Sequence, residues 1–88
     1  MVIKIITISS NYIHLNSSVK KFNIDGIDMI GNMHNGAIIG LNRNGLRFIE
    51  DRNDGLYLHS DILKSNNVED SELFEALRNN MFFENNMY

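Results

Sequence analysis

Two residue types that often dictate architecture, cysteine and proline, are absent from this 88-residue chain. Without cysteine it has no disulfide framework, no thiolate metal site and no cysteine nucleophile. No apolar run approaches the ~20 residues that a membrane-spanning helix needs. The apolar start, residues 2–8, is short, is interrupted by Lys4 and lacks a small-residue cleavage site, so it predicts a β-strand rather than an export signal. These absences favour a cytoplasmic protein with no membrane partner.

The length of the chain predicts one domain over residues 1–88. A fold of this size buries roughly two-thirds of the surface that its unfolded chain exposes, which leaves little material for a deep catalytic cleft. Hydrophobic residues make up 43% of the chain, an ordinary share for a soluble domain, and the formal net charge is −3. The mildly acidic balance disfavours nucleic acid as a partner, because duplex-binding domains are basic.

The most informative segment, residues 28–45, predicts a hairpin that runs directly into a helix. Met29–Met33 and Ala37–Leu41 have the composition of two strands. The turn between them contains Asn35-Gly36, a pair that tolerates positive φ and favours tight hairpins. Asn42 follows the second strand as a good N-cap, because its side-chain oxygen can accept from an amide of the next turn.

The remaining pattern predicts strands first and helices afterwards. Residues 12–15 and 19–24 are expected to be extended. After Asn42, Leu46 and Ile49 recur at helical spacing, with Gly55 as a stop signal. A short helix over residues 61–65, capped by Ser60, comes next.

A third helix follows Asp70 or Ser71, either of which can cap it, and its apolar stripe consists of Leu73, Phe74, Leu77 and Met81. We therefore predict an α+β, winged-helix-like fold. In this fold a three-stranded antiparallel sheet is followed by three helices. Residues 2–8 are the candidate for an extra N-terminal strand of the sheet.

Catalysis finds little support in the sequence. His14, His34 and His59 are scattered and have no metal-ligand spacing. The carboxylates gather at the end of the first predicted helix and at the start of the third, where capping and solubility explain them. We therefore expect no enzyme activity, no cofactor and no metal site.

DNA binding is the main alternative function. Residues 60–80 can be interpreted as a helix-turn-helix, which would make the protein a winged-helix transcriptional regulator. The recognition helix would, however, open with four acidic residues and contain Arg78 as its only cation. Duplex binding depends on lysine and arginine that neutralise phosphates. A small structural subunit of an enzyme complex is a third, weaker alternative.

The same residues resemble the PqqD-like family, the RiPP recognition elements that act as peptide clamps in ribosomal peptide biosynthesis. The matching pieces are Asn35-Gly36, the strand 37–41, the run Leu41-Asn42-Arg43-Asn44-Gly45, the Leu46/Ile49 helix and Asp54-Gly55, continuing through Ile62-Leu63 and Leu73/Leu77. The resemblance covers about residues 19–84. It is closer to the free-standing clamps than to clamp domains of larger enzymes, and it leaves the RiPP subclass and the oligomeric state open.

The resemblance implies that the leader peptide of a precursor adds itself as a strand along residues 37–41 and rests beside the third helix. A sheet edge offers unpaired N–H and C=O groups, and strand addition is an established mode of peptide recognition. The expected leader-binding residues are Ala37, Ile38, Ile39, Gly40 and Leu41 from the strand, and Phe74, Leu77, Arg78 and Met81 from the helix, with Leu73 expected in the core. The expected partners are the leader peptide and a separate modifying enzyme, which would be a radical SAM enzyme, a protease or a cyclase.

Overall fold

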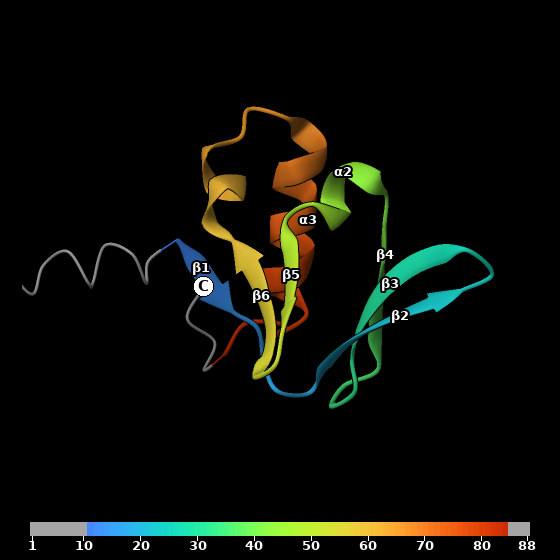
Figure 1. Cartoon of the computed structure of the whole chain (residues 1–88). Helices are drawn as coiled ribbons and strands as arrows, with labels where there is room; N and C mark the ends of the chain where they lie inside the picture. The colour runs from blue at the N-terminus through green and yellow to red at the C-terminus, as the bar shows by residue number, and fades with distance from the viewer. Residues whose placement is uncertain (1–10, 85–88) are drawn as a thin grey trace, which may run out of the picture.

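The computed structural model describes residues 11–84 of the chain, so the strand predicted over residues 2–8 lies outside the described residues. In chain order the elements are β1 (Tyr12–His14), β2 (Val19–Ile24), β3 (Ile27–Asn32), β4 (Ala37–Leu41), the one-turn helix α2 (Arg43–Leu46), β5 (Ile49–Arg52), β6 (Gly55–His59), the 3-10 helix η1 (Ser60–Lys64) and α3 (Val68–Asn79). Figure 1 shows how these elements are arranged.

The described strands form two antiparallel sheets rather than one. One sheet has the order β2-β3-β4 and the other the order β1-β6-β5. The fold is α+β, but the predicted winged-helix-like arrangement of one sheet and three helices is wrong. Among residues 11–84, α3 is the one long helix, and the other two helical elements, α2 and η1, are short.

The first predicted helix is limited to its first turn, α2, and the β5–β6 hairpin takes the place of the rest. Ile49, Leu56 and Leu58 are buried while their neighbours Glu50 and Tyr57 are half-exposed, an alternation of period two. Residues 53–54 form a two-residue turn between the paired Arg52 and Gly55. Asp54-Gly55 therefore closes a hairpin instead of ending a helix.

The two later helices begin differently from the prediction. The segment after Ser60 is a 3-10 helix, and it is capped by the side chain of His59, which accepts from the amide of Asp61. The long helix α3 starts at Val68, because Asn67 rather than Asp70 caps it and accepts from the amide of Glu69. The helix-turn-helix required for the DNA-binding alternative thus lacks a first α-helix.

The local predictions around the β3–β4 hairpin are confirmed. β4 covers residues 37–41, the turn before it contains Gly36 at φ +81°, and Asn42 caps α2 by accepting from the amide of Gly45. Strands were also found, as predicted, over residues 12–14 and 19–24.

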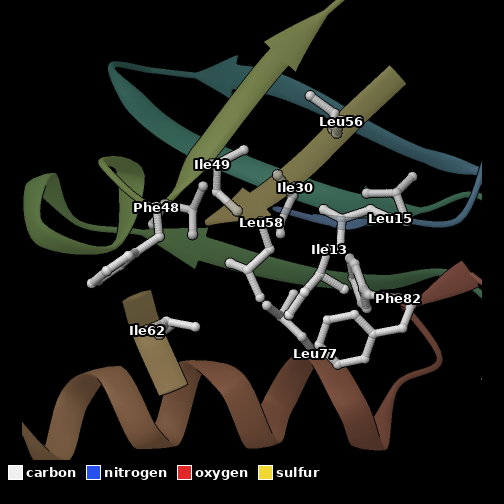
Figure 2. Packing of buried hydrophobic residues seen from close by; sticks show 13 residues of the cluster. Ile13, Leu15, Ile30, Phe48, Ile49, Leu56, Leu58, Ile62, Leu77 and Phe82 are labelled. Atoms are coloured by element: carbon white, nitrogen blue, oxygen red, sulfur yellow. The ribbon is translucent and has the colours of Figure 1, made fainter. Parts of the chain in front are cut away.

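One core joins the two sheets to α3 (Figure 2). Its buried members come from both sheets, from η1, from α3 and from the segment after it: Ile13, Leu15, Val19, Ile30, Leu41, Phe48, Ile49, Leu56, Leu58, Ile62, Leu77, Phe82 and Phe83. Phe83 also forms an isolated antiparallel bridge with Leu15 beside β1. The last described residues therefore complete the core instead of extending α3.

No helix within residues 11–84 combines the length and apolar character needed to cross a bilayer.

Candidate functional site

The strand β4 has an open side, which we call the β4 edge. Among the described residues β4 pairs only with β3, from Asn32↔Ala37 to Asp28↔Leu41. Its side away from β3 has no strand partner in that part of the chain. The strand carries no charged side chain, and Ile38 is 58% exposed.

The register identifies which backbone groups lie on the β4 edge. Asp25 and Gly26, at φ +53° and +84°, form a two-residue turn between the paired Ile24 and Ile27. The closing pair of such a hairpin exchanges both hydrogen bonds, and hydrogen-bonded pairs then alternate along the sheet. The alternation directs the N–H and C=O groups of Ile30 towards Ile39 of β4.

It follows that the backbone groups of Ile38 and Gly40 point away from β3. The turn before β4 agrees with this register, since the amide of Gly36 donates to the carbonyl of Asn32 at 2.8 Å. A side chain added at Gly40 would meet no atom within 4 Å. Two residues spaced by two therefore offer an incoming strand four backbone hydrogen-bonding groups without steric obstruction.

A groove of about 210 Å³ continues from the end of β4 to the first turns of α3. Gly40 and Leu41 line it on one side and Glu69, Glu72 and Leu73 on the other. Its remaining lining residues are Asn42, Asn44, Gly45 and Asp70. Ligand pockets for drug-sized molecules span roughly 300–1,000 Å³, so this groove has room for a peptide side chain rather than a metabolite.

A buried carboxylate fixes the floor of this groove. Asp70 is 1% exposed and accepts hydrogen bonds from Asn44 Nδ2 and Ser65 Oγ, both at 2.6 Å. Arg47 lies 4.0 Å from the same carboxylate and donates to Asn44 Oδ1. Because buried charges are costly unless they are hydrogen-bonded, this network holds α2 and the start of α3 at a fixed spacing.

A second tie joins the hairpin to the other end of α3. The Nδ2 of buried Asn32 donates to the carbonyls of Asn80 and Met81, at 3.2 and 3.0 Å. Asn35 Nδ2 also donates to the Asn80 carbonyl at 2.9 Å. The β3–β4 turn is thereby bound to the end of the helix.

The strand residues expected to bind a leader lie at three depths. Ile38 and Gly40 are exposed, Ala37 and Ile39 pack partly against the core, and Leu41 is buried in it. The side chain of Ile39 thus faces the core, and that of Ile38 lies on the opposite face of the sheet.

The helix residues expected beside the strand are not all accessible. Leu77 is fully buried in the core, so its side chain cannot contact a guest peptide. Phe74 is half-buried against Phe83 at a ring-centroid distance of 5.3 Å. Exposed Arg78 pairs with Glu75 at 3.1 Å, and exposed Met81 lies beyond the end of α3 at φ +61°.

Leu73, expected in the core, is partly buried against it, and it also lines the groove, 3.2 Å from where a side chain on Gly45 would begin. Sequence reasoning missed Asn44 and Asp70, which appeared to be a helix residue and a cap. No signal within a short window could have found them, because the two residues lie 26 positions apart.

The opposite edge of the same sheet, on β2, is different. β2 also pairs only with β3 among the described strands, but it carries exposed Lys20 and Lys21. Lysine on an edge strand is a common protection against unwanted strand pairing. A wider hollow of about 440 Å³ beside this edge is lined by these lysines and by residues of the β5–β6 turn.

Aromatic side chains cover the outside of the β1-β6-β5 sheet. The rings of His14 and Tyr57 stack at 4.5 Å, and Tyr12 and His59 make an edge contact at 4.9 Å. The guanidinium of Arg52 lies 4.2 Å from the Tyr12 ring and 4.7 Å from the Tyr57 ring. The alternation of Tyr12-Ile13-His14 and of Tyr57-Leu58-His59 thus places two histidines that are distant in the sequence on the same surface, each against a tyrosine.

Hydrogen bonds and ion pairs complete this aromatic surface. Arg52 donates a hydrogen bond to Glu50. This bond is the main reason that the pKa of Glu50 lies below its ordinary value. The hydroxyl of Tyr57 donates to Asp54 at 2.7 Å, which lowers the pKa of Asp54 and raises that of Tyr57. Within residues 11–84 no group of three or more His, Asp or Glu side chains is placed to hold a metal ion.

Comparison of the chain with protein-family models, with curated proteins and with solved structures gives no match. The resemblance to the PqqD-like family therefore stays a prediction from the residues.

Proposed function

We propose that this protein is a non-catalytic peptide clamp that binds an extended segment of another chain by strand addition along β4. The observation that carries the proposal is the pair of outward-facing backbone units at Ile38 and Gly40, which has no partner strand within residues 11–84. Backbone hydrogen bonds supply affinity in this mode, and pockets for alternate side chains supply specificity.

The alternation of a strand determines how the guest peptide lies. Its side chains point in turn to the two faces of the sheet. Those on the core side reach the groove between Leu41 and Leu73, and those on the other side lie beside Ile38. The groove has the volume for one such side chain near the start of α3, so that position of the guest carries most of the selectivity.

The resemblance to the PqqD-like family suggests what the guest is. It is the leader peptide of a ribosomally synthesised precursor, which the clamp delivers to a separate modifying enzyme. Holding the leader would raise the effective concentration of the core peptide at that enzyme without any new contact to the core. The chemistry belongs to the enzyme, and the clamp needs no cofactor of its own.

Titration of ¹⁵N-labelled protein with candidate leader peptides of about 20 residues tests this proposal. We expect amide shifts at residues 38–42 and 69–73. Ile38→Pro removes an amide that faces outward, so it should abolish these shifts while β3–β4 pairing remains, as edge strands tolerate proline.

Lys21→Pro is the matched control. Its amide also faces away from β3, but on the β2 edge, so it should leave binding intact. Equal loss in both variants, or shifts that appear only on addition of duplex DNA, would contradict the proposal. Raising the salt concentration separates the two ligands further, because duplex binding falls steeply with salt.

A further inference from the structure

The face of the β2-β3-β4 sheet that points away from the core is apolar and uncovered by any described element. We call it the outer face. By the alternation of the strands it carries the side chains of Lys20, Phe22, Ile24, Ile27, Met29 and Ile38, with Met33 following β3. Ile24, Ile27, Met33 and Ile38 are each about half exposed, at 48%, 53%, 55% and 58%.

Neighbouring side chains are arranged to make this face continuous. A side chain at Gly31 would come within 2.8 Å of Met33 Cε and 3.1 Å of Phe22 Cε1. Glycine at this position therefore lets Met33 and Phe22 fold over the middle of the sheet. The largest contiguous apolar patch on the surface of a protein is often functional.

The charges along the β2–β3 hairpin indicate which partner fits. Lys20 and Lys21 lie at the base of the hairpin and Asp25 at its tip, about 17 Å apart at the rise of a strand. Lys20 is the only charged residue whose side chain points to the outer face among the described strand residues. The tip projects away from α3 (Figure 1).

We infer that the outer face binds the same face of a second copy of this chain, with the two hairpins antiparallel. The pair Phe22↔Met29 lies midway between Lys20 and Ile24 and between Ile27 and Gly31. A two-fold axis through that pair, perpendicular to the strands, places Phe22 and Met29 on their counterparts and the apolar tip of each hairpin on the base of the other. It also brings Asp25 of each copy near Lys20 of the other.

The size of the face sets the strength of the association. Three strands of about six residues cover roughly 15 × 20 Å, less than the ~800 Å² that each partner of a stable complex usually buries. The dimer is therefore reversible and depends on concentration. The β4 edge stays open in it, because faces rather than edges meet, so this inference does not rest on the proposed peptide binding.

Sedimentation velocity of the wild-type chain from about 10 μM to 1 mM provides the test. We expect the mass to rise from monomer towards dimer across this range. Ile27→Thr keeps a β-branched residue but removes apolar contact area. Because both copies of a symmetric dimer carry the substitution, the contact is lost twice, and the dissociation constant should rise about 30-fold. Val68→Thr is the control, since Val68 is 71% exposed but lies on α3.

Charge reversal tests the antiparallel arrangement. Lys20→Glu should weaken the dimer at low salt, while Lys64→Glu, an exposed lysine on η1, should not. A monomer at 1 mM would overturn the inference. A dimer unaffected by both Ile27→Thr and Lys20→Glu would overturn it equally, as would equal weakening by the two control variants.

Discussion

The two sheets of this protein differ in how their exposed surfaces are completed. Outside the β1-β6-β5 sheet, Tyr12, Tyr57 and His14 pack against one another and against Arg52, and their polar atoms pair with nearby carboxylates. Outside the β2-β3-β4 sheet the side chains are isoleucine, methionine and phenylalanine, with Lys20 as the only charged one among the described strand residues. One surface is completed by contacts among the described residues, whereas the other has no described element packed on it.

The comparison also separates the two edges of the β2-β3-β4 sheet. The β2 edge carries two lysines and the β4 edge none. Proteins usually protect exposed strand edges, because such edges pair with other chains. We therefore interpret the uncharged β4 edge beside the groove as a binding edge. The predictions below test this difference, beginning with the largest effect.

Ile39→Pro should have the largest effect on stability. The amide of Ile39 faces Ile30 across the β3–β4 ladder, so proline there removes a sheet hydrogen bond and leaves its acceptor unpaired, which should cost about 1–3 kcal/mol of unfolding free energy. Ile38→Pro, one residue away, should cost far less because its amide faces outward. Urea denaturation of both variants measures the contrast. Similar losses in the two variants would mean that the assigned alternation is wrong.

Ile38→Lys should have an intermediate effect, on binding rather than on folding. It gives the β4 edge the protection that the β2 edge already has, so peptide affinity should fall about tenfold or more while stability changes by less than ~0.5 kcal/mol. Isothermal titration calorimetry and thermal denaturation check the two parts. The variant Val68→Lys, exposed on α3, should leave affinity unchanged; an equal fall there would indicate a general charge effect.

Tyr57→Phe should have the smallest effect. The Tyr57 hydroxyl is the main cause of the lowered pKa of Asp54, so without it this pKa should rise towards 3.8. A carboxylate whose pKa is depressed by folding stabilises the protein above its unfolded-state pKa, and this contribution is lost as the pH falls through the folded-state value. The acid-side loss should therefore diminish in Tyr57→Phe. Carbon-detected NMR titration of Asp54 measures the shift, and an unchanged pKa would contradict the assignment.

Local signals explain what the sequence could predict. Asn35-Gly36 fixes the turn and Asn42 fixes the cap through interactions within four residues, so β4 and its exit were predicted correctly. The segment after Leu46 was misread because Leu46 and Ile49 fit a helical spacing as well as a buried strand. The deciding contacts of Ile49, with Leu58 of β6, form between strands and are not visible in a short window.

The candidate site divides in the same way. The residues of β4 themselves predict this strand. The opposite wall of the groove, however, depends on which face of α3 packs against the core. Leu77 is buried in the same core as Phe82 and Phe83, which follow the helix, whereas Leu73 lines the groove. The tie between Asn44 and Asp70, 26 residues apart, had no local signal at all.

The Asn32 contacts with the carbonyls of Asn80 and Met81 have a mechanical consequence. They tie the far end of α3 to the β3–β4 turn, while the hydrogen bonds of Asp70 with Asn44 and Ser65 hold the first turns of the helix. Because α3 is held at both ends, the gap beside β4 keeps its width, and a guest side chain has to fit the groove without a tilt of the helix.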